Sequence, residues 1–328
     1  MARRELTPAQ LAVVQAVRAF VDRQVLVACS GGPDSTALAL AAAYVAERAG
    51  VRIRAGIIDH GLQDGSDVVA AQASARLSGR GLSCQVLRVE VGEGPSLEAA
   101  ARQARHRGLA QLAQGDPVLL GHTLDDQAET VLLGLARGSG VRSLAGMAPI
   151  SVRDGVELRR PLLGLHRATT VHACVGWGIE TWADPQNLVE DFTRVRVRRS
   201  VLPLLDEYLG PGIPEALART ATLARADADL LDHLARELAG QAVGEAGVDV
   251  EVLAKAPDAL SGRVLLGWLR QGGVVEPGFT HLRAVRSLID DWHGQKGIDL
   301  PGGLCVVRRG GTLVLERSAR SSGDQGRF

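Results

Sequence analysis

Residues 24–35 read Gln24-Val25-Leu26-Val27-Ala28-Cys29-Ser30-Gly31-Gly32-Pro33-Asp34-Ser35. An apolar run that predicts a core strand passes here into a glycine turn, and a helical pattern follows from Thr36. Glycine reaches backbone dihedrals that other residues avoid, and the first N–H groups of a helix point outward without partners. Because the helix dipole also favours negative charge there, this stretch predicts a cradle for a phosphate group.

Several residues of this cradle carry chemistry. Ser30 and Ser35 can donate their hydroxyls to phosphate oxygens. Asp34 would repel a bare phosphate, so it fits the site if Mg²⁺ stands between them; the alternative is that it caps the helix. The fingerprints G-x-G-x-x-G and G-x-x-x-x-G-K-[ST] are both absent. The motif instead resembles the pyrophosphate loop of N-type ATP pyrophosphatases, which split ATP into AMP and pyrophosphate, and an ordinary strand-to-helix turn is the alternative.

Composition limits the classes of protein to consider. The chain has 328 residues, 46% of them hydrophobic, which is enough for a large α/β domain and a smaller one. The formal net charge of +0 argues against capture of nucleic acid by the whole surface, so local patches must provide such contacts. Cys29, Cys84, Cys174 and Cys305 lie far apart and predict neither a zinc site nor a disulfide framework. With no cleavable leader or membrane-spanning run, we expect a cytoplasmic protein without a membrane partner.

Strand-like and helix-like runs alternate from Leu11 to Leu204, with strands predicted at 25–29, 51–58, 83–89 and 118–121. This βαβ series predicts a parallel sheet with helices on both faces, and ligands bound beyond the carboxyl ends of the strands. The glycine and proline residues at 210–214 break the pattern, so the predicted catalytic domain covers residues 1–212. The remaining predictions are a smaller domain at 213–318, helical through Trp292 and ending in strands at 297–300, 304–308 and 312–316, and a polar, disordered tail at 319–328.

A second motif, Asp59-His60-Gly61-Leu62, follows the second predicted strand. Parallel strands end at the same edge of a sheet, so this motif is expected near the phosphate cradle, where it could reach adenine, ribose or metal. The alternative is that Asp59 is a turn or N-cap residue and His60 an ordinary surface histidine.

The third motif, Gly121 to Thr130, opens the helix after the fourth predicted strand. Asp125, Asp126 and Glu129 are spaced so that these carboxylates share one face near the helix start. Three clustered carboxylates repel one another, and Mg²⁺ or a cationic substrate would relieve that repulsion. The alternative is a capping box between Thr123 and Asp126.

Two groups of arginines are candidates for contacts with nucleic acid. Arg102 and Arg105 lie near Glu98 on a predicted helix, where a solvated, salt-bridged face is the ordinary interpretation. Residues 192–199 carry Arg194, Arg196 and two further arginines, more than the nearby Asp191 and Asp206 can neutralise. This surplus favours contacts with a phosphate backbone.

Taken together, the motifs resemble the tRNA(Ile)-lysidine synthetase family in order and spacing. They are the residues at 30–35, 59–62, 98–102, 121–130, 138–140, 160–163 and 182–187, and residues 300–303 also resemble a part of that family's C-terminal domain. Departures occur at Thr123, Gln186 and Val195, where family members often carry histidine, serine and asparagine. The resemblance implies an adenine-nucleotide α-hydrolase-like (PP-loop) fold. It also implies a ligase that adenylates the wobble cytidine in the CAU anticodon of tRNA(Ile) and lets free L-lysine displace AMP.

The resemblance implies roles for particular residues. ATP would be bound by Ser30, Gly31, Gly32, Pro33, Asp34, Ser35 and His60. The tRNA and substrate contacts would come from Arg102, Arg105, Asp184, Arg194 and Arg196. Trp182 and Phe192 are the nearest aromatic residues that could stack on the cytidine; the alternative is that each anchors the core, which we expect for Trp182. Mg²⁺ would be held by Asp34, Asp125 and Asp126.

The second step of this reaction needs a neutral amine, although the pKa of the lysine side chain is about 10.4 in water. Desolvation or a carboxylate base is therefore required at the point of attack. The candidate catalytic residues are Asp34, Asp59, Asp126 and Glu129, and which of the last three accepts the proton stays open.

Two other functions are compatible with the phosphate cradle. A PP-loop tRNA thiolase would need accessible cysteines or an iron–sulfur site, and the scattered cysteines argue against it. A non-catalytic nucleotide-binding sensor would not need the carboxylate cluster. The sequence leaves open the oligomeric state, a homodimer included, and how tRNA(Ile) is distinguished from tRNA(Met). Because the second C-terminal domain of longer family members is absent, we expect less surface for the tRNA acceptor stem.

Overall fold

The computed structural model describes residues 5–93, 96–138, 140–184 and 192–318. The chain forms two compact units, residues 1–222 and 223–328, and each is described by itself. The predicted domain boundary after Gly212 falls directly before α10 (Ile213–Ala242), whereas the two compact units divide inside this helix. The tail predicted at 319–328 lies outside the described residues.

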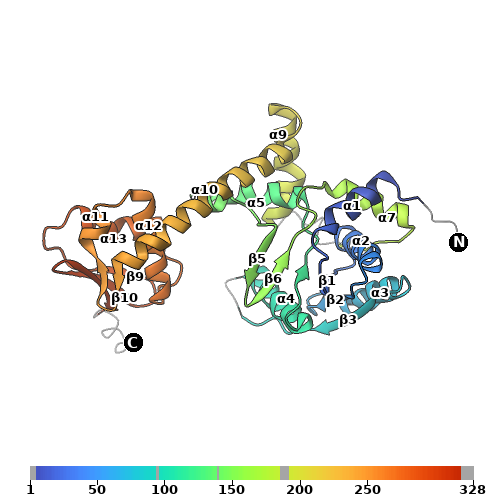
Figure 1. The fold of residues 1–328 in the computed structure, drawn as a ribbon, viewed down its shortest axis with the longest axis horizontal. Coiled ribbons are helices and arrows are strands. Elements are labelled where there is room, and N and C mark those ends of the chain that lie inside the picture. The colour runs from blue at the N-terminus through green and yellow to red at the C-terminus, as the bar shows by residue number, and fades with distance from the viewer. Residues whose placement is uncertain (1–4, 94–95, 139, 185–191, 319–328) are drawn as a thin grey trace. The chain divides into compact units, whose positions relative to one another are not determined.

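A six-stranded sheet in the order β3-β2-β1-β4-β6-β5 forms the centre of the first unit (Figure 1). Its strands are β1 (Val25–Ala28), β2 (Ile53–Asp59), β3 (Ser83–Arg88), β4 (Val118–Leu119), β5 (Ile150–Arg153) and β6 (Val156–Arg159). β5 runs antiparallel to β6, and all other neighbouring strands are parallel. The predicted strands and their parallel arrangement are confirmed. β5 and β6 lie beyond the sequence prediction and make the sheet mostly, not entirely, parallel.

Consecutive residues of β1 are buried. Since successive side chains of a strand point to opposite sides, both faces of β1 are covered. Val25 and Val27 pack into a cluster shared with α1 (Pro8–Arg18), α2 (Pro33–Ala49), α3 (Ser66–Ser78) and α7 (Arg167–Trp177). Leu26 packs on the opposite side with Leu109 of α4 (Leu97–Ala113). Helices therefore cover both faces, as predicted, and the carboxyl ends of β1, β2 and β4 are left to build a site.

The remaining helices of the first unit follow β4 and β6 in the chain. They are α5 (Leu124–Ala136), α6 (Val141–Leu144), α8 (Thr193–Arg196), a π-helical segment (Val197–Val201), α9 (Leu202–Leu209) and the first turns of α10. Ala128 of α5 packs with Val197 and Leu202, so this apolar contact holds the π-helical segment against α5. The same segment carries Arg198.

The second unit combines helices with a five-stranded antiparallel sheet in the order β7-β8-β11-β10-β9. Its elements after α10 are β7 (Val243–Gly244), β8 (Gly247–Asp249), α11 (Val250–Ala254), α12 (Asp258–Gln271), α13 (Phe279–Asp290), β9 (Ile298–Leu300), β10 (Leu304–Arg309) and β11 (Thr312–Arg317). The last three strands agree with the prediction. The β7–β8 hairpin interrupts the predicted helical region, and it needs Gly247, whose φ is +131° and whose added Cβ would overlap the carbonyl oxygen of Leu313.

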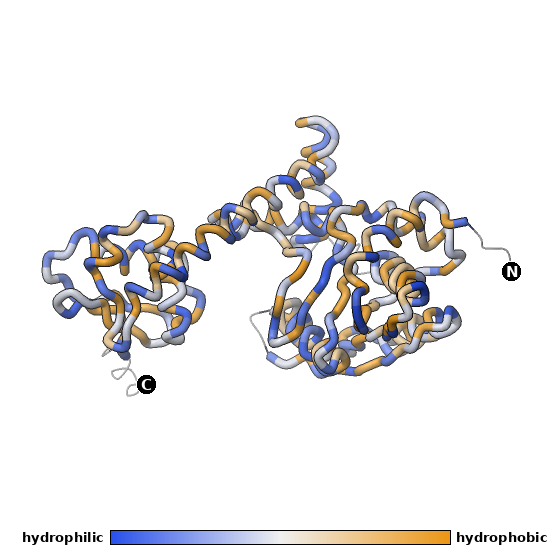
Figure 2. Tube along the Cα trace, viewed as in Figure 1, coloured by the Kyte–Doolittle hydropathy of each residue, from blue (hydrophilic) through white to orange (hydrophobic). Residues whose placement is uncertain are grey.

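The helix α10 is 30 residues long, and apolar and polar residues alternate along it (Figure 2). Such alternation at helical intervals agrees with the leucine pattern from Leu217 to Leu238. Across the described parts of the chain, no helix combines the length and the apolar character needed to cross a membrane.

Candidate active site

The predicted phosphate cradle forms where β1 turns into α2. Gly31 has a φ of +85°, in the left-handed region, and an added Cβ would lie 3.1 Å from the Cβ of Ala73. Gly32 is the N-cap of α2 and Pro33 its first residue, and Gly32 offers no side chain to cap this end. Asp34 is therefore not the helix cap, and the first N–H groups of α2 form the kind of helix end that attracts anions.

The two serines of the cradle differ in their surroundings. The buried Ser35 hydroxyl donates to the carbonyl of Gly32 at 3.1 Å and accepts the N–H of Ser30 at 3.1 Å, so it braces the loop. Ser30 is exposed, and its hydroxyl lies 3.3 Å from that of Ser35. The N–H of Trp182 donates to the carbonyl of Gly31 at 2.9 Å and supports the turn from outside. Ser30 is thus the cradle hydroxyl with access to a ligand.

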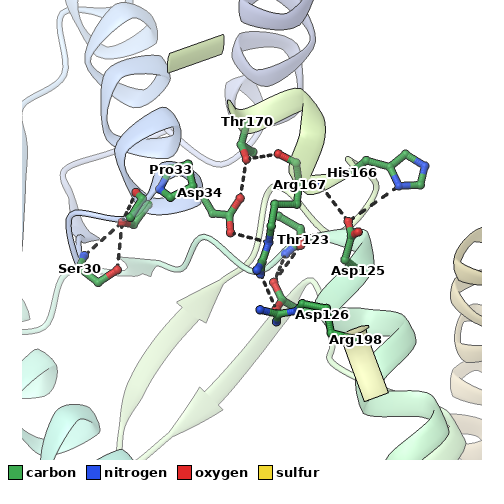
Figure 3. Close-up of polar contacts among 12 residues, drawn as sticks. Ser30, Pro33, Asp34, Thr123, Asp125, Asp126, His166, Arg167, Thr170 and Arg198 are labelled. Atoms are coloured by element: carbon green, nitrogen blue, oxygen red, sulfur yellow. Dashed lines mark hydrogen bonds and ion pairs between the residues drawn. The ribbon is translucent and has the colours of Figure 1, made fainter. Parts of the chain in front are cut away.

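Asp34 points from the first turn of α2 toward α7 (Figure 3). Its Oδ1 accepts a hydrogen bond from the hydroxyl of Thr170, and its Oδ2 lies 3.2 Å from Nε of Arg167. Burial raises the pKa of Asp34, while Arg167 and Thr170 oppose that shift. The Asp34 carboxyl next to the cradle is therefore partly shielded from water, and nearby cations stabilise its ionised form.

The turn from β4 into α5 brings the third motif against the cradle. An added Cβ at Gly121 would lie 3.1 Å from the backbone of Asp34 and of Ser35. The N–H and hydroxyl of Thr123 donate to Oδ2 of Asp126 at 2.8 and 2.9 Å. The capping box considered from the sequence is therefore present, and it uses only one of the two carboxylate oxygens of Asp126.

The other oxygen of Asp126 belongs to a network of charges (Figure 3). Its Oδ1 lies 3.1 Å from Nη2 of Arg167 and 3.3 Å from Nη2 of Arg198. Glu129 is fully buried, and its Oε1 accepts from Nε of Arg198 at 2.6 Å. The second oxygen of Glu129, Oε2, is buried without a hydrogen-bond partner among the described residues. A buried acceptor left unpaired in this way is costly unless a ligand provides a donor.

The carboxyls of Asp126 and Glu129 have opposite pKa shifts. Burial alone would raise the pKa of Asp126, but the charge of Arg167 and the hydrogen bonds from Thr123 outweigh it and lower the pKa. Burial raises the pKa of Glu129 above its ordinary value despite Arg198. Asp126 is thus held ionised, whereas Glu129 has the greater tendency to accept a proton.

Asp125 completes the predicted carboxylate cluster on the opposite side of Arg167. Its Oδ2 accepts the backbone N–H of Arg167 at 2.8 Å and lies 3.8 Å from Nδ1 of His166. The structure thus gathers Asp34, Asp125 and Asp126 around Arg167. Within residues 5–93, 96–138, 140–184 and 192–318, no three histidine, cysteine, aspartate or glutamate side chains are grouped as a metal site.

Asp59 lies at the end of β2 and is engaged in its own turn. Its Oδ1 accepts the N–H of Gly61 at 2.9 Å, and its Oδ2 lies 4.0 Å from Nη1 of Arg88. Burial opposes the shift, but hydrogen bonds from Ser66 and Gly61 lower its pKa. These are the contacts of a turn residue, the alternative considered from the sequence. His60 is half-buried, and burial followed by the charge of Arg105 lowers its pKa.

Arg102 of α4 and Arg194 of α8 both act electrostatically on Arg105 of α4, and we call these three residues the basic cluster. Burial and the charges of Arg102 and Arg194 lower the pKa of Arg105, whose Nε is buried without a hydrogen-bond partner among the described residues. Burial together with nearby arginines lowers the pKa of His106 to about 4, and that of His122 to about 3 despite the opposing charge of Asp126. Concentrated positive charge beside neutral histidines is a surface that attracts anions.

The other sequence-predicted contact residues differ in their exposure. Arg196 is exposed and donates to the hydroxyl of Thr193 at 3.2 Å. Asp184 is half-buried at the end of a described segment, and Gln186 lies outside the described residues. Phe192 is 38% exposed, whereas Trp182 is half-buried against the cradle.

The sequence did not predict the roles of three residues that the structure places at the site. Arg167 and Thr170 come from α7, which carries none of the motifs, and Arg198 counted only as one of several surface arginines. Arg198 pairs with Asp126 and Glu129, so it does not add to the surplus of charge at 192–199. The carboxylate cluster was the sequence signal that could have indicated these arginines. Buried acids require cations as partners, and such cations can come from distant parts of the chain.

Comparisons with known proteins show which families the two parts of the chain resemble. The PP-loop domain family matches residues 6–205, and the TilS substrate binding domain family matches residues 249–314. A tRNA(Ile)-lysidine synthase of Rhodococcus erythropolis is 51% identical over 320 residues, which cover 94% of this chain and 96% of that protein. The tRNA(Ile)-lysidine synthase of Cutibacterium acnes is 46% identical, with 97% and 99% covered. That of Mycobacterium tuberculosis is 47% identical, with 89% and 90% covered.

Among solved structures, the U34-tRNA thiolase NcsA of Methanococcus maripaludis is similar, with a TM-score of 0.50 over 66% of this chain and 79% of that chain. The two sequences are 15% identical. At this identity the likeness concerns the fold alone.

Proposed function

The chain belongs to the tRNA(Ile)-lysidine synthase family, and we propose that it joins lysine to the wobble cytidine of tRNA(Ile) with a CAU anticodon. In the first step the C2 oxygen of cytidine bonds to the α-phosphorus of ATP, and pyrophosphate leaves. In the second step the lysine amine bonds to C2, and AMP leaves. One observation carries the assignment of both steps to one site. Asp34, beside the cradle, and Asp126, which shares Arg198 with Glu129, both contact the guanidinium of Arg167.

For the first step we assign the phosphates of ATP to the N-terminus of α2, with the Ser30 hydroxyl as a donor. Use of ATP follows from the PP-loop domain. Asp34 is our first candidate for holding Mg²⁺, because this ion binds one or two carboxylates together with phosphate oxygens and Asp34 lies in the first turn of α2 beside the cradle. Asp126 is the second candidate, and it would exchange a contact with Arg167 or Arg198 for the ion. Bound there, Mg²⁺ would offset the charge of the departing pyrophosphate. Asp125 fits less well, since its carboxylate bonds the backbone of Arg167.

For the second step we assign the lysine amine to Glu129. The unpaired Oε2 of Glu129 is a buried acceptor, and an ammonium group would provide the donor that it lacks. The raised pKa of Glu129 makes it a stronger base than Asp126, whose pKa is lowered. Glu129 therefore accepts the proton as the amine attacks, and Asp126 keeps a fixed negative charge nearby. We favour Glu129 over Asp59 for this step, because Asp59 accepts a hydrogen bond from the backbone of its own turn.

For tRNA we assign the basic cluster to the phosphates near the wobble nucleotide. Arg105 offers a buried N–H that has no acceptor within the described part of the chain, and a phosphate oxygen would supply one. Arg196 and Phe192 are exposed nearby in the chain and can extend the contact along the backbone. The second unit contains the match to the TilS substrate binding domain and is our candidate for further tRNA contacts. Because tRNA is the substrate, we keep the cytoplasmic assignment.

The two buried cysteines of the first unit do not favour the thiolase alternative. Cys29 and Cys174 are buried, and burial raises the pKa of both thiols, that of Cys174 to about 12. Cys84 lies on β3 of the first unit, and Cys305 lies on β10 of the second unit. High thiol pKa values oppose the thiolate chemistry of sulfur transfer.

The decisive experiment incubates the full chain with radiolabelled lysine, ATP and a CAU-anticodon tRNA(Ile) transcript. We expect release of pyrophosphate in the first step, and label in the tRNA with release of AMP only when lysine is present. A tRNA(Met) transcript with the same anticodon is the control. Binding of ATP without AMP release would indicate a sensor, and label from a sulfur donor in place of lysine would indicate a thiolase.

A further inference from the structure

Arg167 stands at the N-terminus of α7 and joins three parts of the first unit (Figure 3). Its Nε lies 3.2 Å from Asp34 of α2, and its Nη2 donates to Asp126 of α5 at 3.1 Å. Its backbone N–H donates to Asp125 at 2.8 Å. A side chain fixed in this way cannot move relative to one of the acids without disturbing the other.

The Nε–H of Arg167 is a donor without an acceptor. Although it lies near Asp34, the geometry is that of an ion pair, and Nε is buried without a hydrogen-bond partner among the described residues. Its position next to Asp34 puts it at the first turn of α2, beside the cradle. A phosphate oxygen in the cradle would satisfy this donor, and guanidinium groups suit phosphate because they present several donors in a plane.

Arg198 cannot replace Arg167 in this position. Its contacts are with Asp126 and Glu129, and its ion pairs do not include Asp34 among the described residues. Both oxygens of Asp126 are occupied, Oδ2 by Thr123 and Oδ1 by the two arginines. The orientation of Asp126 therefore depends on Arg167 as well as on Arg198.

We propose that Arg167 is shared by the two half-sites: its Nε–H binds a phosphate of the nucleotide, while its Nη2 positions Asp126 for the lysine amine. This inference rests on the proposed nucleotide and lysine sites. It adds that one side chain serves both, so that a single substitution weakens adenylation and lysine use together.

The test uses Arg167→Lys in the full chain, because lysine keeps the charge but loses the planar fork that spans two carboxylates. Equilibrium binding of α,β-methylene ATP, whose α–β bond resists cleavage, reports the nucleotide half-site. The KM for lysine, measured at saturating ATP and tRNA, reports the other half-site. We expect the Kd for the analogue and the KM for lysine each to rise about tenfold, a change equivalent to ~1.4 kcal/mol.

Arg80→Lys is the matched control. Arg80 donates to the carbonyls of Trp177 and Gly178 at the other end of α7, at 2.8 and 2.9 Å, so its replacement loosens the same helix away from the site. We expect it to change neither constant. Equal effects of both variants would reduce Arg167 to a structural support of α7 and overturn the inference.

A second variant guards against misfolding. Thr170→Val removes the hydroxyl that bonds Asp34 and the backbone carbonyl of Arg167, but it leaves the guanidinium of Arg167 and its contact with Asp126 in place. It should therefore affect analogue binding and leave the KM for lysine unchanged. A change in only one constant in Arg167→Lys, or in neither, contradicts a shared role. If the unaltered protein does not bind α,β-methylene ATP, the proposed nucleotide site fails and this inference fails with it. If it binds the analogue and Arg167→Lys behaves normally, the inference alone is wrong.

Discussion

Glu129 and Asp126 lie one helical turn apart, yet their surroundings divide the work of base and fixed charge between them. Asp126 receives hydrogen bonds and ion pairs on both oxygens, whereas Glu129 keeps Oε2 unpaired in a fully buried position. Two titratable groups with pKa values pushed apart are a common sign of acid and base roles. The distinction comes from contacts far apart in the sequence, so the sequence alone could not order these candidates.

The substitution Glu129→Gln tests this assignment. Glutamine keeps the shape and the contact with Arg198 but cannot accept a proton, so we expect lysine transfer to slow about 100-fold. Adenylation does not need this base, and pyrophosphate release in the absence of lysine serves as the internal control. Equal losses in the two steps would contradict a role confined to the amine.

His122 provides a prediction about stability. Its pKa in the folded protein is about 3, against an ordinary value of 6.5, because burial and nearby arginines disfavour the charged ring. As pH falls below 6.5 the unfolded chain takes up a proton at this histidine while the folded chain does not, so folding stability falls between pH 6.5 and pH 3. Replacing it with Gln should therefore reduce the loss of unfolding free energy between pH 7.5 and pH 5 by ~2 kcal/mol.

Urea denaturation at the two pH values measures this effect. His106 has a pKa of about 4 and contributes a loss of the same sign, so part of the pH dependence should survive in the variant. An unchanged pH dependence in His122→Gln would show that His122 titrates normally in the folded state.

At the scale of elements, the site depends on how closely the β4–α5 turn approaches α2. Gly121 has the backbone of Asp34 and Ser35 where its Cβ would be, with 3.1 Å to each. In Gly121→Ala, backbone must move on one side or the other, and we expect a cost of about 1–3 kcal/mol in stability and weaker binding of α,β-methylene ATP.

Gly240→Ala is the matched control, since no atom lies within 4 Å of a Cβ at this position of α10. We expect it to raise the Tm slightly, because alanine restricts the unfolded chain. Should Gly121→Ala bind the nucleotide analogue as tightly as the control does, the close approach would have no bearing on the cradle.

The elements that the sequence predicted are those with strong local patterns. The βα units and the glycine turn after β1 were clear because buried parallel strands read as apolar runs. The β5–β6 hairpin was missed, although Asp154-Gly155 is a common hairpin turn and both residues have positive φ, +51° and +76°. Its strands mix polar and apolar residues, as in Val156–Arg159, and such short runs resemble loops. Arg167 could not be predicted, since a bridging cation is defined by the fold and not by its neighbours in the chain.

At the scale of the whole molecule, a protein with a formal net charge of +0 must bind tRNA through unneutralised local charges. In the second unit, adjacent arginines differ in this respect. Arg309 pairs with Glu316 at 2.6 Å, whereas Arg308 donates to the carbonyls of Gly310 and Leu288 and lies over the ring of Trp292, 5.3 Å from its centroid. Carbonyl groups do not cancel the charge of a guanidinium, and Trp292 is 37% exposed.

The substitutions Arg308→Gln and Arg309→Gln therefore form a matched pair on one strand. If the second unit contacts tRNA, as its match to a substrate binding domain suggests, Arg308→Gln should weaken tRNA binding several-fold and reduce the salt slope by about one. Arg309→Gln should change both far less, because Glu316 already neutralises that charge. Binding of α,β-methylene ATP should be the same in both, since the cradle lies in the first unit. Identical salt slopes for the two variants would mean that tRNA does not contact this strand, and the basic cluster of the first unit would then have to supply the phosphate contacts.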